Sequence, residues 1–188
     1  MIMPTYKMVF IGDKKVGKTS LFKYFLKEKL SKVYEETKNI QKTKKVQIEN
    51  LKGMKFKLYD TPGKSKTMEF ASDCFLNQDC FLLMYDMTNK QSFESIKKIW
   101  LPYANEIYKV KHQILQNGNA PVIIIGNKSD SDPKDIVVNT KEVQAFAKKK
   151  EIPFIEISVI KLINIGKLTS LISELLEKTQ DNYYSYYC

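Results

Sequence analysis

The segment Gly12–Thr19 reads GDKKVGKT and matches the pattern G-x-x-x-x-G-K-[ST]. A loop of this kind turns several backbone amides toward one point, where they can bind an anion at the start of a helix. The ammonium of Lys18 can reach the outer phosphates of a nucleotide, and the hydroxyl of Thr19 can ligate a magnesium ion. The segment therefore predicts a phosphate-binding loop.

A second short motif, Asp60-Thr61-Pro62-Gly63, follows an alternating apolar segment. At the end of a strand, Asp60 can approach the magnesium ion of the phosphate-binding loop, and the amide of Gly63 can meet a terminal phosphate. The same short sequence also occurs in ordinary turns. It indicates a binding site only in combination with the phosphate-binding loop upstream. Together the two motifs predict a site for a phosphorylated ligand with magnesium.

The third motif, Asn127-Lys128-Ser129-Asp130, directly follows the apolar run VIIIG. A carboxylate at Asp130 can accept hydrogen bonds from the ring N–H and the exocyclic amine of guanine, a donor pair that adenine lacks. The stem of Lys128 can cover the face of the base, and Asn127 can tie this loop to the phosphate-binding loop. The motif predicts selectivity for guanine over adenine.

These motifs need elements that bring them to one edge of a sheet. Compact apolar or alternating segments predict strands at 6–11, 44–48, 54–59, 80–85, 122–125 and 153–157. Helical spacing predicts helices at 20–30, 93–110, 140–150 and 165–177. We expect the second and third strands to form an antiparallel hairpin around a turn at 50–53, and a loop at 61–66. The alternation predicts an α/β fold, with a six-stranded, mostly parallel sheet, helices on both faces and one antiparallel edge strand.

The composition narrows the class of protein. The chain has 188 residues, 43% hydrophobic and 28% charged, which suits one globular domain. Its 31 basic residues are all lysines and give a net charge of +10. Because arginine is the preferred side chain for reading guanine edges and phosphates in nucleic acids, we expect no nucleic-acid partner.

The three cysteines, Cys74, Cys80 and Cys188, lack zinc-ligand spacing and predict no disulfide framework. With no signal peptide and no long apolar run, we expect a cytoplasmic protein.

With the motifs in this order, the chain resembles a small GTPase of the Ras superfamily, nearest to the Rab branch, over roughly residues 5–178. The resemblance rests on GDKKVGKTS, DTPG, YDMTNKQSF, GNKSD and the stretch Glu156-Ile157-Ser158. It implies the P-loop NTPase fold and a switch that binds GTP or GDP with Mg²⁺ and hydrolyses GTP. It also implies an exchange factor, an activating protein and effectors as partners, in vesicle traffic or signalling.

The resemblance carries the family's site residues onto matching positions of this chain. The catalytic group comprises Lys18, Thr37, Gly63 and Lys64, and the magnesium ligands are Thr19, Thr37 and Asp60. Thr43 is the alternative to Thr37 as the threonine that joins magnesium to the terminal phosphate. The nucleotide contacts are expected at Asp13, Lys14, Lys15, Val16, Gly17, Lys18, Thr19, Ser20, Tyr34, Thr37, Gly63, Asn127, Lys128, Asp130, Ser158, Val159 and Ile160.

Departures from the family pattern affect the expected activity. Lys64 occupies the position of the glutamine that orients the attacking water, and an ammonium has hydrogen-bond donors only, so we expect slow hydrolysis. Lys14 and Lys15 fill loop positions that are small in the family. These lysines leave open a pseudo-GTPase, a binding module that holds nucleotide without useful turnover.

The end of the chain also departs from the family. We expect a small GTPase domain at 1–178 and a flexible tail at 179–188. Rab-like chains usually end in paired, prenylated cysteines, whereas this tail ends in the single Cys188. Peripheral membrane association through a lipid on Cys188, on the cytosolic face of an internal membrane, is therefore an open alternative.

Overall fold

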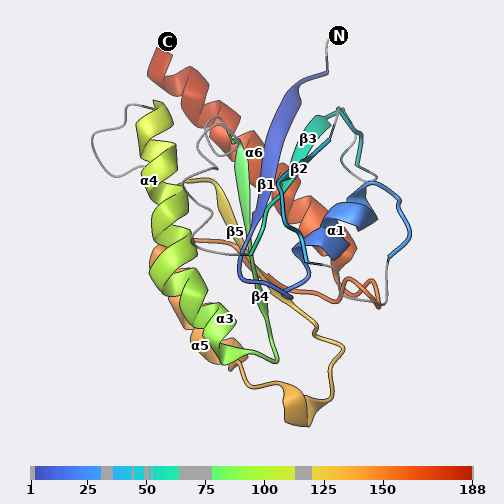
Figure 1. Ribbon diagram of the computed structural model, residues 1–188. Helices are drawn as coiled ribbons and strands as arrows, with labels where there is room; N and C mark the ends of the chain where they lie inside the picture. Colours follow the sequence, from blue (N-terminus) through green and yellow to red (C-terminus); the bar gives the residue numbers. More distant parts are fainter. Residues whose placement is uncertain are drawn as a thin grey trace.

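The computed structural model describes residues 3–30, 36–43, 45–48, 51, 53–63, 78–112 and 120–187 (Figure 1). The strands are β1 (Thr5–Ile11), β2 (Gln41–Lys42), β3 (Lys55–Asp60), β4 (Cys80–Asp86), β5 (Val122–Asn127) and β6 (Phe154–Glu156). The helices are α1 (Lys18–Phe25), α3 (Lys90–Ser95), α4 (Leu101–His112), α5 (Thr140–Lys150) and α6 (Ile165–Tyr187). Two shorter helical segments are the π-helical η2 (Ile96–Trp100) and the 3-10 turn η3 (Pro133–Asp135).

The strands form a six-stranded sheet in the order β2-β3-β1-β4-β5-β6. β2 runs antiparallel to β3, and the other neighbouring pairs are parallel. Every residue of β4 and β5 is buried, as expected of central strands that are covered on both faces. The predicted fold class, a mostly parallel α/β sheet with an antiparallel edge strand, is confirmed.

Helices cover both faces of this sheet (Figure 1). On one face, α1 and α6 share a core cluster with Phe10 of β1, to which they contribute residues such as Phe22 and Leu168. On the other face, α3, η2, α4 and α5 share a cluster with the neighbouring strand residue Val9. Successive residues of β1 thus face opposite layers, and both layers fix the end of β1 from which the phosphate-binding loop starts.

The antiparallel edge includes the predicted segment, but its strand lies nearer the N-terminus than the sequence predicts. The segment 44–48 contributes only the bridge between Val46 and Phe56 within the described residues, whereas β2 pairs with Tyr59 and Asp60 of β3. Both residues of β2 are exposed. The prediction of a strand at 44–48 depended on alternating hydrophobicity, and two exposed polar residues at a sheet edge give no such signal.

The first helix starts and ends earlier than the predicted 20–30. It begins directly after Gly17, whose φ of 100° lets the loop turn into the helix. It ends at Phe25, and Lys27 then adopts a left-handed φ of 57°, a common way for a helix to stop. The consequence for the site is that Lys18 and Thr19 lie in the first turn of α1.

The last helix is longer than predicted. The sequence pattern places the end of this helix at 177, whereas α6 continues to Tyr187. The physical reason is that residues 178–187 contain no glycine or proline to break the helix. Cys188 lies outside the described residues. No helix in the described part of the chain is long and apolar enough to span a bilayer.

The predicted helix at 93–110 is interrupted by a wider turn. Within η2 the N–H of Leu101 donates to the carbonyl of Ile96, five residues earlier. Pro102 follows, and in regular α geometry its ring would collide with the carbonyl of Lys98. The π turn relieves this collision and shifts the side chains that follow it, as such turns often do near functional sites.

Candidate functional site

Several loops at the carboxyl ends of the strands surround one pocket of about 440 Å³. They are the loop after β1 with the start of α1, the segment before β2, and the loops after β3, β5 and β6. In a parallel sheet this edge is the usual place for a ligand. The lining residues are Lys14, Lys15, Gly17, Lys18, Thr19, Ser20, Lys23, Glu36, Thr37, Gln41, Thr61, Gly63, Asn127, Lys128, Asp130, Ser158, Val159 and Ile160.

The phosphate-binding loop is wrapped around the ammonium of Lys18. Lys18 Nζ donates to the carbonyl of Gly12 at 2.9 Å and to that of Asp13 at 2.7 Å. The side chain is buried, and this desolvation lowers the pKa of Lys18 to about 8, although the charges of Asp60 and Asp13 act in the opposite direction. A buried ammonium of this kind is stabilised by an anion, so the loop is suited to hold a phosphate.

The backbone of this loop requires its two glycines. Gly12 has φ 146°, and a Cβ on it would lie 2.1 Å from the carbonyl oxygen of Met84. Gly17 has φ 100°, and a Cβ there would lie 2.1 Å from Asn127 Nδ2. No side chain caps the N-terminus of α1. Gly17 at the N-cap has no side chain to satisfy the amides of this first turn, which are therefore suited to bind an anion.

Three oxygen-bearing side chains meet beside Lys18. Thr19 Oγ1 donates to Asp60 Oδ2 at 2.6 Å, and the hydroxyl oxygens of Thr19 and Thr37 lie 2.8 Å apart. The other oxygen of Asp60, Oδ1, is buried without a hydrogen-bond partner among the described residues. Burial raises the pKa of Asp60, and the Thr19 hydrogen bond and the charge of Lys18 counteract this rise. Carboxylate and hydroxyl oxygens are suitable ligands for Mg²⁺, and an added cation would satisfy the unpaired oxygen.

The alternative threonine, Thr43, lies in a different environment. Its hydroxyl accepts a hydrogen bond from the N–H of Leu58 at 2.9 Å, and its own N–H donates to the carbonyl of Leu58 at 3.1 Å. Both bonds hold Thr43 against β3. Of the two candidates, Thr37 is the one that lies beside Thr19.

The other end of the pocket contains the third motif. Asn127 is buried; its Nδ2 donates to the carbonyl of Val16 at 2.9 Å, and its Oδ1 accepts from the N–H of Val159 at 3.2 Å. This one side chain therefore links three loops. Asp130 lines the pocket and is exposed. Its carboxylate is thus accessible to the hydrogen-bond donors of a base.

Lys128 is held by a residue outside the predicted site. Its ammonium forms an ion pair with Asp86 at the end of β4, and the other carboxylate oxygen of Asp86 accepts from the N–H and the hydroxyl of Thr88. Lys128 has a left-handed φ of 70°. The ion pair orients a side chain whose backbone conformation is rare for a residue with a Cβ.

Most of the predicted site residues line the pocket, and three of those that the structure describes, Asp13, Val16 and Asp60, do not. Asp13 points away from it, because its carboxylate accepts from Trp100 Nε1 at 2.8 Å. Val16 is wholly buried behind the loop. Asp60 reaches the pocket through Thr19. Tyr34 and Lys64 lie outside the described residues.

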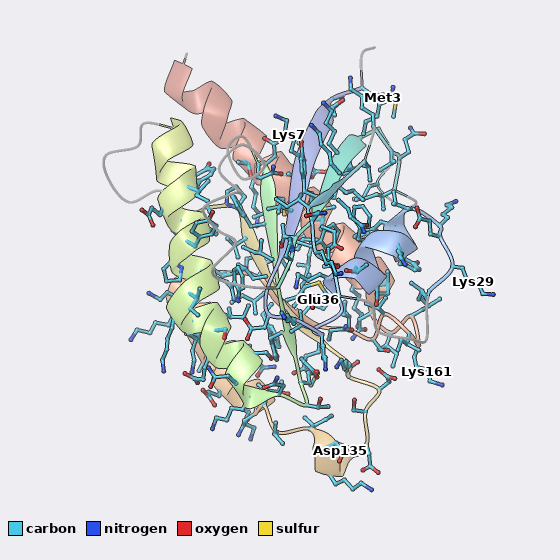
Figure 2. All side chains as sticks on the ribbon, in the orientation of Figure 1. Met3, Lys7, Lys29, Glu36, Asp135 and Lys161 are labelled. Carbon is cyan, nitrogen blue, oxygen red and sulfur yellow. The ribbon has the colours of Figure 1, made fainter. Side chains whose placement is uncertain are left out.

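Sequence reasoning missed other residues of the site. Four of them line the pocket: Lys23, Glu36, Gln41 and Thr61. Figure 2 shows Glu36 near the middle of the molecule, beside the ribbon of α1. In the sequence, only the position of Glu36 next to Thr37 could have indicated that it lines the pocket. Asp86 and Trp100 act from outside the pocket, and no local pattern connects them with it.

Comparisons with known proteins agree with this geometry. Residues 7–178 match the Ras family. RabZ of Dictyostelium discoideum is 31% identical over 183 residues, which cover 94% of this chain and 75% of that protein. The Ypt/Rab-type GTPase YPT7 of Saccharomyces cerevisiae is 31% identical over 161 residues, 85% of this chain and 75% of YPT7. SEC4 of the same yeast is 31% identical over 177 residues, 94% of this chain and 77% of SEC4.

The family match covers the segments that surround the pocket. The match spans the phosphate-binding loop, the aspartate at the end of β3 and the loop after β5, and the fold brings these three segments around one pocket. The chain therefore belongs to the Ras family and is a divergent, Rab-like small GTPase.

Proposed function

We propose that this pocket binds GTP and GDP with Mg²⁺ and that the chain works as a guanine-nucleotide switch. The observation that carries the proposal is that Asp130 lines the same pocket as Lys18 and Thr19. A base-reading carboxylate and a phosphate-binding loop within one pocket match the two ends of a guanine nucleotide.

A competition experiment tests this proposal. Nucleotide-free protein is loaded with a fluorescent GDP analogue, and GDP, GTP, ADP and ATP are compared as competitors. The guanine nucleotides should displace the probe at much lower concentration than the adenine nucleotides, because adenine has no donor pair for Asp130. Equal competition by ATP would contradict the proposal and favour a P-loop ATPase.

Magnesium fits the proposed site through the oxygens of Thr19, Thr37 and Asp60. When bound, the ion would supply positive charge to the outer phosphates. The residues of the chain would then bind and orient the nucleotide: Lys18 at the outer phosphates, the loop amides around them, and Asp130 at the base. We expect removal of magnesium by EDTA to speed GDP release, which fluorescence of the bound analogue measures.

We further propose that GTP hydrolysis is slow. Lys64 can pair with the terminal phosphate, but its ammonium cannot accept a hydrogen bond from the attacking water as a glutamine amide can. Binding of this kind stabilises the bound substrate without lowering the barrier. The chain has no arginine to stabilise the transition state. We expect a single-turnover rate at or below about 10⁻⁴ s⁻¹.

The Lys64→Gln variant tests the role of this residue. We expect hydrolysis about tenfold faster, a barrier lower by ~1.4 kcal/mol, because the amide can orient water. Single-turnover measurement of phosphate release compares the two proteins, with Lys55→Gln on β3 as the matched control. A variant no faster than its parent would show that Lys64 does not limit the rate.

The second candidate function is a pseudo-GTPase that holds nucleotide and recruits partners without useful turnover. The observation that favours it is the pair of lysines, Lys14 and Lys15, that line the pocket where family members carry small residues. Single-turnover hydrolysis separates the two functions. No phosphate release over many hours, by protein that still binds GTP, would identify the pseudo-GTPase.

We also propose a role in vesicle traffic, with an exchange factor, an activating protein and effectors as partners. The support is the similarity to Rab-type GTPases such as YPT7. Cys188 is the residue available for a lipid that would attach the chain to the cytosolic face of an internal membrane. The intact mass of protein isolated from its own cells tests this attachment: an unmodified Cys188 throughout would remove the lipid anchor.

A further inference from the structure

An ion pair joins the phosphate-binding loop to the segment that carries Thr37. Lys14 Nζ lies 2.6 Å from Glu36 Oε1, and the two side chains are 38% and 37% exposed. Both residues line the pocket. Thr37 follows Glu36 directly, and its hydroxyl contacts that of Thr19. The pair therefore ties a loop that binds phosphate to a residue beside the candidate magnesium ligands.

Lys14 stands at one end of the pocket. A Cβ on Gly63 would lie 2.3 Å from the backbone nitrogen of Lys14, so the loop after β3 lies directly against Lys14. Asp130, the proposed base-reading residue, lines the same pocket from the loop after β5. The proposed function assigns the end near Gly63 and Thr37 to the terminal phosphate. The ammonium of Lys14 is thus at the end of the pocket where a triphosphate and a diphosphate differ.

We propose that Glu36 competes with the terminal phosphate for the ammonium of Lys14, and thereby limits how strongly the site prefers GTP to GDP. With GDP bound, Lys14 stays on Glu36 and holds the Thr37 segment against the loop. With GTP bound, the ammonium of Lys14 interacts with both the Glu36 carboxylate and the terminal phosphate. The gain from its contact with the phosphate is therefore partly offset by the weakening of the ion pair. This inference rests on the proposed guanine-nucleotide function.

The competition requires both members of the ion pair, Lys14 and Glu36. A small residue at position 14 would offer no ammonium, and Glu36 would then only repel a phosphate. With lysine at this position the carboxylate has two effects: repulsion of the phosphate and competition for a shared cation. These two effects can be separated, because only the second one requires Lys14.

A double-mutant cycle measures the competition. The dissociation constants for GDP and for a non-hydrolysable GTP analogue are compared, with Mg²⁺, for the wild type, Glu36→Gln, Lys14→Gln and the double variant. Glu36→Gln should raise the preference for the triphosphate analogue about threefold to fivefold, the range that a half-exposed ion pair allows. In the Lys14→Gln background the same substitution should have a clearly smaller effect, since only the repulsion by the carboxylate is relieved and no ammonium is present to be released.

Glu28→Gln serves as the matched control. Glu28 is an exposed residue just after α1 and does not line the pocket, so its neutralisation changes the net charge equally without touching the pair. The control should keep the wild-type preference. A rise in Glu28→Gln equal to that in Glu36→Gln would show a general charge effect and overturn the inference.

Two further results would overturn it. An equal rise from Glu36→Gln in both backgrounds would show simple repulsion by the carboxylate rather than competition. If Glu36→Gln left the preference for the triphosphate analogue over GDP unchanged, Glu36 would not compete with the phosphate for Lys14. In both cases guanine nucleotides still bind, so the proposed function stands; wild-type protein that binds neither nucleotide would overturn both.

Discussion

At the scale of single residues, the pocket depends on which atoms can donate and which can accept. Asp130 is acceptor-only when ionised, and it lines the pocket in an exposed position. Lys18, by contrast, is buried and donates to two carbonyls of its own loop. One residue thus selects the base by its hydrogen-bonding pattern, while the other provides a positive charge that a phosphate stabilises.

We expect Asp130→Asn to weaken GDP binding by several kcal/mol, roughly the contribution of a charge-assisted bidentate pair. The variant should shift its preference toward xanthine nucleotides, because an amide can donate to the carbonyl that replaces the exocyclic amine. Titration with GDP and with xanthosine diphosphate measures both changes. Asp135→Asn, in the exposed turn η3, is the control and should bind as the wild type does. GDP binding of wild-type strength by Asp130→Asn would show that the base is read elsewhere.

At the scale of elements, the loop after β3 meets the phosphate-binding loop through backbone atoms. Gly63 illustrates this: a Cβ would lie 2.3 Å from the nitrogen and 2.6 Å from the Cα of Lys14. These neighbours are backbone atoms of a loop that Lys18 holds in place, so they cannot move aside easily. The close approach of the loop after β3 to the phosphate-binding loop therefore requires glycine.

We expect Gly63→Ala to displace the loop after β3 and weaken binding of a non-hydrolysable GTP analogue about tenfold, or ~1.4 kcal/mol. GDP binding should change less, because GDP lacks the phosphate that Gly63 would meet. Gly166→Ala is the matched control: nothing lies within 4 Å of a Cβ at this position in α6. Alanine there should stabilise the helix by roughly 0.5–1 kcal/mol and leave binding unchanged. Equal affinity of the two variants for the GTP analogue would show that the close contact at Gly63 does not matter for binding.

At the scale of the whole molecule, one buried amide joins segments that are far apart in the chain. Asn127 bonds Val16 in the phosphate-binding loop and Val159 after β6, while its backbone belongs to β5. The Asn127 side chain is 4% exposed, so water cannot readily replace these bonds. The site is thus assembled by the same hydrogen bonds that stabilise the fold.

We expect Asn127→Ala to lower the free energy of unfolding by about 2–4 kcal/mol, since two buried backbone groups lose their partners. Nucleotide affinity should fall as well. Asn139→Ala is the comparison, because the Asn139 side-chain oxygen accepts an exposed hydrogen bond from the N–H of Lys141 at the start of α5. Its loss should reduce stability by about 1 kcal/mol without changing affinity. Chemical denaturation and nucleotide titration measure both variants, and equal losses would contradict the bridging role of Asn127.

The sequence by itself determined the fold class and the chemistry of the three motifs. Apolar strands alternating with helical segments are visible locally, because burial on both faces and helical periodicity each leave a pattern within a few residues. The phosphate-binding loop is likewise contiguous, so its glycines and Lys18 could be assigned before any tertiary contact was known. Element ends were less predictable: α6 continues to Tyr187, and the antiparallel edge strand lies at Gln41–Lys42.

Only the tertiary structure decided which distant residues support the site. Trp100 meets Asp13 across 87 residues of chain, and Lys128 meets Asp86 across 42. The pairing of Lys14 with Glu36 has the same character. No local pattern contains these contacts, because they form only when elements distant in the chain pack together. A sequence motif can identify which side chains are able to bind a nucleotide, whereas the packing of the layers decides which partners hold them there.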